Sequence, residues 1–306
     1  MTLTEKSISV IIPTRNRFEL LKEAIDSVLS QSMLPKEIII LDDCSDAAHK
    51  NNIQSIQELD SSIQVHLLKE HKGVSFCRNL GLEIAVGEYV LFLDDDDTLN
   101  NDMLEKSIEA LEGFDVVSCR THVFSSTTKN QSLNQTDCIT PLAMTKLIKA
   151  YNWQKTATFD TYKLEENPAA HIFLYHPMIH SFVFRREVFE KIRFPEDLSY
   201  GEDFYVWLFL ANSGVKFKKL DFVGGNCRVH ENSLSASASV SKKLKFYDRI
   251  LTELNLSGEV RNLALFKMAI IRWKSKDISF LPYLLKTLSH PKLFLRHSWH
   301  FMNLHK

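Results

Sequence analysis

The sequence predicts an α/β fold in which a mostly parallel sheet is flanked by helices. Short apolar segments alternate with amphipathic helical segments over residues 1–124, which is the pattern of repeated strand–helix–strand units. Strands joined by such crossover helices run parallel. The 306 residues are 44% hydrophobic and 25% charged, a composition typical of one large globular domain, with or without an appendage.

Five strands are predicted in this first part, each short, apolar and bounded by polar or turn residues. They cover residues 7–13, 37–41, 63–68, 89–93 and 115–119. The helices predicted between them cover residues 18–31, 46–59, 74–85 and 103–111. The first helix illustrates the basis of these assignments, because Leu21, Ile25 and Val28 recur at the spacing of one helix face.

The second part of the chain has a less regular pattern. The predicted elements are a polar loop at 125–137, helices at 142–151 and from 204 to 210, and a strand at 216–223. From Val240 onward the pattern is helical throughout. We therefore divide the chain into a body, residues 1–238, and a C-terminal helical region, residues 239–306.

Charge is divided unevenly between these two parts. Residues 242–306 carry 13 Lys and Arg against four Asp and Glu, a net charge of +9. Residues 1–241 carry 24 against 34, a net charge of −10, so the whole chain has a net charge of −1. An acidic body with a basic tail predicts contact with a negatively charged surface. A membrane is favoured over nucleic acid because the tail is also rich in Leu, Phe and Trp.

The tail is predicted to form two short amphipathic helices that lie on an anionic membrane surface. Between Phe280 and Leu304, apolar residues are interspersed with Lys and Arg, and Pro282 and Pro291 divide the stretch. Because proline interrupts a helix, no segment reaches the ~20 apolar residues that span a bilayer. The alternative is that these residues pack on the body or form a contact between two copies, so an oligomer is also compatible with the sequence.

Cysteine usage and the N-terminus predict a cytoplasmic protein, bound peripherally to the inner face of the cell membrane if the tail binds lipid. The residues Met1–Lys6 lack the apolar core of a signal peptide. The cysteines are odd in number and lack the CxxC spacing of a zinc site. They are Cys44, Cys77, Cys119, Cys138 and Cys227.

Four consecutive aspartates, Asp94–Asp97, follow the predicted strand at 89–93. A strand this apolar delivers its carboxylates to its carboxyl end, the edge at which open α/β sheets bind ligands. Adjacent carboxylates repel one another, and Mg²⁺ or Mn²⁺ relieves that repulsion while often sharing substrate phosphates. The segment therefore predicts a metal–phosphate site, with a solvated acidic turn as the alternative.

Polar residues also follow the first two strands and open the third predicted helix. In residues 13–17 (PTRNR), backbone groups and Arg15 or Arg17 could hold a nucleotide, although a plain turn explains them equally well. Asp43 could accept hydrogen bonds from a base or ribose, or belong to a helix cap. Arg78 lies one turn into its helix, where its planar fork suits phosphate, although solvated arginines are common there.

Together these segments resemble the nucleotide-sugar domain of family 2 glycosyltransferases. The segments VIIPTRNR, ILDDCS, GVSFCRNLGL and GEYVLFLDDDD match the order and spacing of the family over residues 7–124. The resemblance implies a GT-A-type, Rossmann-like fold, a UDP-sugar donor and a DxD motif at Asp94 and Asp96, with Asp96 as the ligand of Mn²⁺ or Mg²⁺. The other implied donor contacts are Pro13, Thr14 and Arg15, Asp43 at the base or ribose, Arg78 near the base and diphosphate, and Asp95 at the ribose.

The resemblance extends into the second part of the body. Residues 194–203 (FPEDLSYGED) look like the family's Glu-Asp motif, in which the aspartate is the general base. Asp203 is therefore expected to take the proton of the acceptor hydroxyl in an inverting transfer, with Glu202 orienting it or the acceptor. Residues 227–235 (CRVHENSLS) resemble the segment that closes over the diphosphate. There Arg228 would neutralise phosphate and His230 would bind metal or phosphate, with a structural histidine as the alternative.

These resemblances imply a domain organisation and an acceptor class. Residues 1–238 would be the catalytic domain, with residues 1–124 binding the nucleotide-sugar and residues 125–238 forming the acceptor half. The acceptor would be a saccharide or a lipid-linked glycan, in bacterial cell-surface polysaccharide or lipopolysaccharide synthesis.

Two other functions account for part of the sequence. Residues 94–99 (DDDDTL) fit the DxDxT motif of haloacid-dehalogenase-like phosphatases, with Asp94 as nucleophile, Asp96 as acid/base and Ser118 as a second motif. Against it, Asp97 replaces the glycine usual there, and several strand–helix units precede the motif. The other alternative is a nucleotide-sugar-binding protein without catalysis, which the intact Glu202–Asp203 pair disfavours.

Overall fold

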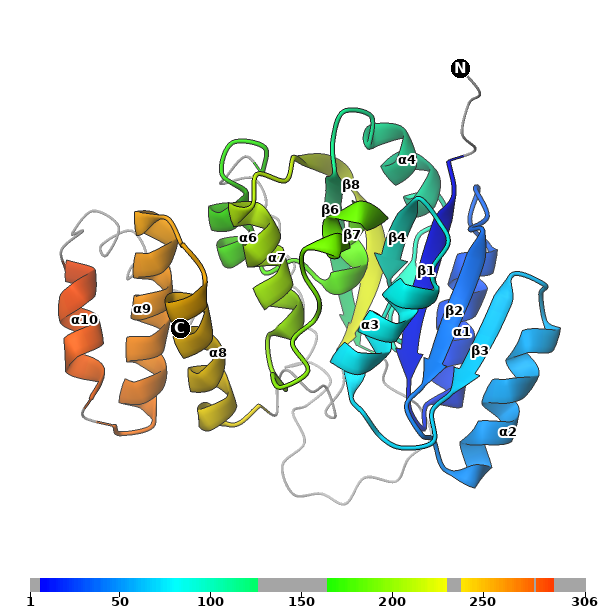
Figure 1. The fold of residues 1–306 in the computed structure, drawn as a ribbon, viewed down its shortest axis with the longest axis horizontal. Coiled ribbons are helices and arrows are strands. Elements are labelled where there is room, and N and C mark those ends of the chain that lie inside the picture. The colour runs from blue at the N-terminus through cyan, green and yellow to red at the C-terminus, as the bar shows by residue number, and fades with distance from the viewer. Residues whose placement is uncertain (1–5, 126–163, 230–237, 278, 289–306) are drawn as a thin grey trace.

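One eight-stranded sheet with helices on both faces organises residues 6–125, 164–229, 238–277 and 279–288, which this computed structural model describes (Figure 1). The strands are β1 (Ile8–Thr14), β2 (Glu37–Asp42), β3 (Ile63–Leu67), β4 (Tyr89–Phe92), β5 (Thr98–Leu99), β6 (Val116–Ser125), β7 (Phe182–Arg185) and β8 (Phe217–Val229). The helices of the body are α1 (Phe18–Leu29), α2 (Ala47–Ser55), α3 (Val74–Ile84), α4 (Met103–Ala110), α6 (Pro168–Tyr175) and α7 (Glu202–Asn212). Short 3₁₀ segments are η1 (Ile56–Glu58), η2 (Ile179–Ser181) and η3 (Arg186–Glu190).

The strand order is β3-β2-β1-β4-β7-β6-β8-β5. All pairings among β3, β2, β1 and β4 are parallel, as strands joined by crossover helices must be. The other half of the sheet is mixed, because β7 runs antiparallel to both β4 and β6 while β6 and β8 run parallel. The α/β fold class with a helix-flanked sheet and C-terminal helices is confirmed.

The predicted strands and helices of the first part are present, with ends displaced by a few residues. Strands β6 and β8 run further than the sequence predicts because they pair with each other from Val116 and Phe217 to Ser125 and Val229. Strands β5 and β7 and helix α6 were not predicted, since they are short and lie in stretches without a clear period. The predicted helix at 142–151 and the loop beyond Ser125 lie outside the described residues.

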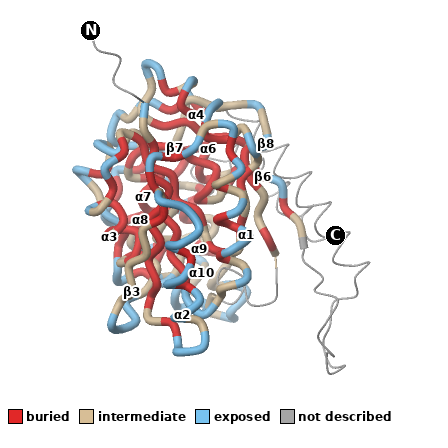
Figure 2. The backbone as a smooth tube through the Cα atoms, turned by 90° about the vertical axis from the view of Figure 1, so that its right-hand side faces the viewer, coloured by how far each residue is buried: buried red, intermediate tan, exposed pale blue. Residues whose placement is uncertain are grey.

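Alternate residues of the central strands build two apolar layers, one on each face of the sheet. Ile11, Ile39 and Phe92 belong to the larger layer, together with buried residues of α3, α6 and α7. The other layer joins the opposite faces of β1, β2 and β4 to α1 and α4. Figure 2 shows the buried backbone in the interior and the exposed residues at turns and on outer helix faces. The acidic residues at the strand ends therefore follow strands that are packed between two apolar layers.

The C-terminal helices are α8 (Val240–Glu253), α9 (Gly258–Lys274) and α10 (Phe280–Leu288), which lie in a row at one end of the molecule with α10 outermost (Figure 1). Phe246 of α8 and Val260 of α9 are buried in the same layer as Trp207 of α7. Thus α8 and α9 share a core with the body, although the sequence predicts a boundary at residue 238. No helix among the described residues combines the length and apolar character needed to cross a bilayer.

Candidate active site

The carboxyl ends of β1, β2 and β4 lie next to one another at one edge of the sheet. Thr14 is in register with Asp42, and Ile11 is in register with Phe92, shortly before the acidic residues begin. The backbone N–H of Asp43 donates to the carbonyl of Thr14 at 2.9 Å, which joins the two loops as they leave the sheet. Because the strands are parallel, the three predicted polar segments meet at the edge where such sheets bind ligands.

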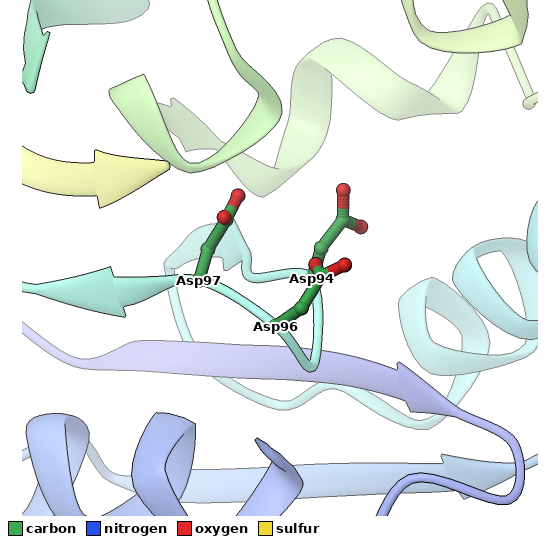
Figure 3. A group of neighbouring side chains, drawn as sticks. All are labelled: Asp94, Asp96 and Asp97. Atoms are coloured by element: carbon green, nitrogen blue, oxygen red, sulfur yellow. The ribbon is translucent and has the colours of Figure 1, made fainter. Parts of the chain in front are cut away.

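The acidic loop, Asp94–Asp97, forms a compact group of carboxylates. One oxygen each from Asp94, Asp96 and Asp97 lies within 4.8 Å of the others, and Figure 3 shows the three side chains on the same side of the loop. Carboxylate oxygens at this spacing are the donor set that Mg²⁺ or Mn²⁺ prefers. The residues present therefore fit a divalent cation. The sequence pointed to Asp94 and Asp96, and the structure adds Asp97.

Asp97 is held from two sides. Nδ1 of His180 lies 2.9 Å from one carboxylate oxygen, and the backbone N–H of Arg228 donates to the other oxygen at 2.9 Å. The side chain of His180 is fully buried, where Gly225 leaves it room, since a Cβ on Gly225 would stand 2.5 Å from its Cδ2. Asp97 therefore ties the acidic loop to β8, while Asp94 and Asp96 carry the predicted metal contacts.

Asp95 points away from that group toward β1. Its carboxylate accepts the hydroxyl of Thr14 at 2.8 Å and Nη1 of Arg17 at 3.1 Å. Burial raises the pKa of Asp95 to about 7, and the Arg17 guanidinium opposes that rise. Each of its oxygens thus accepts one hydrogen bond within the protein, which holds Asp95 against the end of β1.

Arg78 joins the acidic loop to the Glu-Asp pair. Its side chain is 4% exposed, with Nη2 2.9 Å from Asp94 and Nη1 2.8 Å from Glu202. The two carboxylates raise the pKa of the guanidinium against the effect of burial, and the ring of Phe194 lies 5.4 Å from its central carbon. The sequence places Arg78 near the base and diphosphate, and the structure shows that it bridges the two acidic segments.

Asp203 and Glu202 occupy the first turn of α7. One oxygen of Asp203 accepts the backbone N–H of Phe204 at 2.7 Å, whereas Glu202 faces Arg78. Burial raises the pKa of Asp203 to about 7, the charge of Glu202 adds to that rise, and the charge of Arg78 opposes it. A carboxylate with a pKa near the working pH is suited to take a proton from a hydroxyl group.

Gly201 lies directly before the acidic pair, as the N-cap residue of α7. It lies in the left-handed region at φ +73°, and a Cβ there would stand 2.7 Å from the ring of Phe246. We expect Gly201→Ala to lower the unfolding free energy by roughly 1–3 kcal/mol, because the backbone is strained and the ring must move. Urea unfolding measures the loss. Gly113→Ala is the control, since φ there is also positive but nothing lies within 4 Å. If both variants lose the same unfolding free energy, the contact with the ring of Phe246 does not contribute to the loss.

The remaining predicted donor residues lie around the ends of β1 and β2. Asp43 is buried and accepts the backbone N–H groups of Lys72 and Gly73 at 2.7 and 2.9 Å, so it fixes the loop before α3. Pro13 is buried at the end of β1, and Arg15 is exposed at the start of the loop that follows. All three residues lie on the edge where the sequence places the nucleotide, but Asp43 already has protein partners.

Arg228 reaches the acidic loop through its backbone and side chain. Besides the N–H donated to Asp97, its Nε donates to the carbonyl of Asp96 at 3.0 Å, and Nη2 pairs with Glu23 of α1. Arg228 is therefore well placed near the predicted phosphate site, although its side chain is held by Glu23. His230, the other predicted residue of this segment, lies outside the described residues.

Sequence reasoning gave no metal or donor role to Asp97, His180 or Glu23, and it left Arg17 as one of two arginines that could hold a nucleotide. A lone histidine or glutamate does not reveal its partner in the sequence. His180 lies 83 residues from Asp97, and Glu23 lies 205 residues from Arg228. For Arg17 a signal existed, since a cation shortly beyond a strand end can face acids at the end of a neighbouring strand.

Comparisons with known proteins bear on the family and the fold of this chain. The model of the family "Glycosyl transferase family 2" matches residues 9–193, more than half of the chain. A putative teichuronic acid biosynthesis glycosyltransferase, TuaG of Bacillus subtilis, is 40% identical over 109 residues, which are 36% of this chain and 43% of that protein. A GalNAc(5)-diNAcBac-PP-undecaprenol β-1,3-glucosyltransferase of Campylobacter jejuni is 40% identical over 121 residues, 39% of this chain and 37% of that protein. The matches thus span less than half of these relatives.

A solved structure has the same fold. Residues 1–349 of TarS from S. aureus, in complex with UDP-GlcNAc, superpose with a TM-score of 0.61 at 20% identity, covering 88% of this chain and 73% of that one. At this identity the likeness concerns the fold alone. It confirms the GT-A-type architecture expected from the sequence.

Proposed function

This chain belongs to glycosyl transferase family 2, and on that premise we propose that it is an inverting, metal-dependent transferase that moves a sugar from a UDP-sugar to a glycan acceptor. One observation supports the proposal most directly. The buried guanidinium of Arg78 bonds Asp94 of the acidic loop and Glu202 beside Asp203, so the proposed cation site and the proposed base lie on either side of one side chain. The family assignment leaves no support for the phosphatase alternative.

Asp203 is proposed to act as the general base. The hydroxyl of a sugar has a pKa far above neutrality, so a carboxylate must take its proton as the new bond forms. Arg78 holds Glu202 at 2.8 Å and thereby fixes one member of the pair, which leaves Asp203 as the carboxylate available to the acceptor. Inversion follows if the acceptor attacks the anomeric carbon from the side opposite the leaving diphosphate.

Asp94 and Asp96 are proposed to hold Mn²⁺ or Mg²⁺, with Asp97 fixing the loop from behind. When bound, a divalent cation stabilises the charge that develops on the leaving diphosphate. Arg228 of β8 lies beside the same loop and would add a positive charge on that side. Pro13, Thr14, Arg15, Asp43 and Asp95 line the edge where the nucleoside would bind. UDP as the nucleotide is supported by the UDP-GlcNAc complex of the TarS neighbour.

The acceptor is proposed to be a saccharide or a lipid-linked glycan of the bacterial cell surface. The names of both curated relatives support this class, since one concerns teichuronic acid and the other an undecaprenol diphosphate. The decisive experiment incubates the full chain with individual UDP-sugars, Mn²⁺ and candidate acceptors, and measures UDP release by chromatography. UDP release that depends on acceptor is the expected result. Binding of a UDP-sugar without transfer to any acceptor would favour the non-catalytic alternative. A covalent phosphoryl group on Asp94 would favour the phosphatase alternative and contradict the proposed function.

The exposed side chains of α9 and α10 are proposed to rest on the cytoplasmic face of an anionic membrane. Trp273 of α9 and Leu281 and Leu285 of α10 are 60%, 49% and 57% exposed, and Lys274 and Lys286 are exposed on the same two helices. Apolar side chains beside lysines are the composition of an interfacial surface. Such a surface would hold the chain at the membrane, where a lipid-linked acceptor lies.

We expect the double variant Leu281→Asp/Leu285→Asp to lose at least about tenfold in affinity for phosphatidylglycerol vesicles, because two leucines that would enter the membrane are replaced by anions. Vesicle flotation of the full chain measures the effect at low salt. The control is Leu34→Asp/Leu59→Asp, which changes two exposed leucines of the body. If wild-type protein does not float, or if both double variants float equally well, the tail does not form the membrane contact.

A further inference from the structure

Arg17 contacts the acidic loop from the opposite side to Arg78. It is the residue before α1, and its carbonyl accepts the N–H of Leu21 at 2.9 Å, which fixes its backbone at the helix start. Its side chain extends to the acidic loop, where Nη1 lies 3.1 Å from Asp95 and 3.0 Å from Asp96. One nitrogen thus contacts two carboxylates, one of which is the predicted metal ligand.

Among the described residues, the other basic side chains that lie against carboxylates of the acidic loop are fixed in place. Arg78 is 4% exposed and is bonded to Glu202 through its second terminal nitrogen. His180 is fully buried against Asp97. Arg17 differs from both, since its side chain is 30% exposed and its ion pairs are with Asp95 and Asp96 of this loop. Its contact with Asp96 can therefore open while its guanidinium stays partly exposed and paired with Asp95.

We propose that Arg17 is the resting counter-ion of the acidic loop, which a divalent cation displaces from Asp96 when the nucleotide-sugar binds. The inference rests on the proposed metal and UDP-sugar site. A guanidinium and a divalent cation that bind the same carboxylate repel each other, so each weakens the binding of the other to Asp96. Arg17 keeps its contact with Asp95 and turns its free nitrogens toward the diphosphate, whose oxygens suit the planar fork of arginine.

This role predicts that removing the Arg17 charge changes two affinities in opposite directions. Without nucleotide, Arg17 competes with the cation, so Arg17→Gln should bind Mn²⁺ alone about tenfold more tightly than wild type. With nucleotide, the same guanidinium supports the diphosphate, so Arg17→Gln should bind UDP in saturating Mn²⁺ about tenfold more weakly. Isothermal titration calorimetry of the full chain measures both affinities, using MnCl₂ alone and then UDP with Mn²⁺ present.

Two further variants separate this role from a change in net charge or in folding. Lys22→Gln removes the same charge from an exposed position of α1 that does not touch the acidic loop, and both affinities should stay as in wild type. Arg17→Lys keeps the charge but not the fork, so the affinity for Mn²⁺ alone should stay near wild type while that for UDP falls. Thermal unfolding of each variant confirms that it is folded.

The outcomes distinguish this inference from the proposed function. If wild type binds Mn²⁺ with UDP and Arg17→Gln binds Mn²⁺ alone within twofold of wild type, the counter-ion role is wrong and the metal site stands. If Arg17→Gln weakens both affinities, Arg17 supports the cation and does not compete with it, which also overturns the inference. Wild-type protein that binds no Mn²⁺ under either condition overturns the inference and the metal site together.

Discussion

Replacing Asp203 with Asn should reduce turnover by about 10²-fold or more while UDP-sugar affinity stays close to wild type. Asn has the size of Asp but cannot take the proton of the acceptor hydroxyl. The bond between Arg78 and Glu202 does not involve Asp203, so the donor side should remain intact. Steady-state kinetics give turnover, and calorimetry with the UDP-sugar gives the affinity. Normal turnover, or lost donor affinity with normal turnover, would place the base elsewhere.

The pH dependence provides a second test of Asp203. Its pKa is raised to about 7, first by burial and then by Glu202, and only the ionised carboxylate accepts a proton. Wild-type turnover should therefore rise as the pH passes upward through about 7. Stability should follow the opposite trend, because a carboxyl that holds its proton more tightly when folded loses stability as the pH rises from its unfolded pKa near 4. The Tm of Asp203→Asn relative to wild type should therefore be higher at about pH 8 than at about pH 5.

Asp197 is the matched control for both measurements. It precedes the same helix, but it is exposed and its pKa is lowered, first by its bond to Arg249. Asp197→Asn should leave turnover near wild type. Its contribution to stability is lost only as the pH falls below about 4, because its pKa is lowered in the folded chain, so the Tm difference for Asp197→Asn should stay nearly constant between about pH 5 and about pH 8. A Tm difference that follows pH in the same direction for both variants would contradict the assignment to Asp203.

Asp96→Ala should reduce turnover by about 10²–10³-fold, which corresponds to an activation free energy about 3–4 kcal/mol higher. The physical reason is that the leaving diphosphate loses the cation that stabilises it. Asp96 offers one oxygen of the group that lies within 4.8 Å, and the variant should also bind Mn²⁺ more weakly in the presence of UDP. Titration calorimetry measures the cation affinity, and the UDP-release assay measures turnover.

Asp102→Ala is the control for Asp96. It removes a carboxylate that follows the acidic loop closely in sequence but pairs with Lys106 on α4, so turnover and Mn²⁺ affinity should not change. Wild-type protein should lose activity in excess EDTA. If Asp96→Ala keeps full activity in excess EDTA, the reaction does not depend on a cation at this loop, and the metal assignment is wrong.

The sequence by itself determined the fold class and the identity of most of the acidic and basic residues at the sheet edge. Apolar periodicity is a property of neighbouring residues, so β1, β2, β3 and β4 and their helices could be read from the chain directly. An apolar strand also dictates where following charges must lie, since burial of unpaired carboxylates is unfavourable. The positions of Asp94, Asp96 and Asp203 at helix or strand ends therefore follow from local sequence alone.

The tertiary structure alone decided which of these residues touch. Arg78 lies 16 residues from Asp94 and 124 from Glu202, and their bonds exist because the sheet order brings α3, β4 and α7 together. The same order inserts β7 between β4 and β6, which puts His180 behind Asp97. Strand order and long-range burial arise from interactions summed over the whole chain, whereas periodicity reports only local preference. For this reason the sequence identified most of the charged residues, and the fold alone determined which of them became partners.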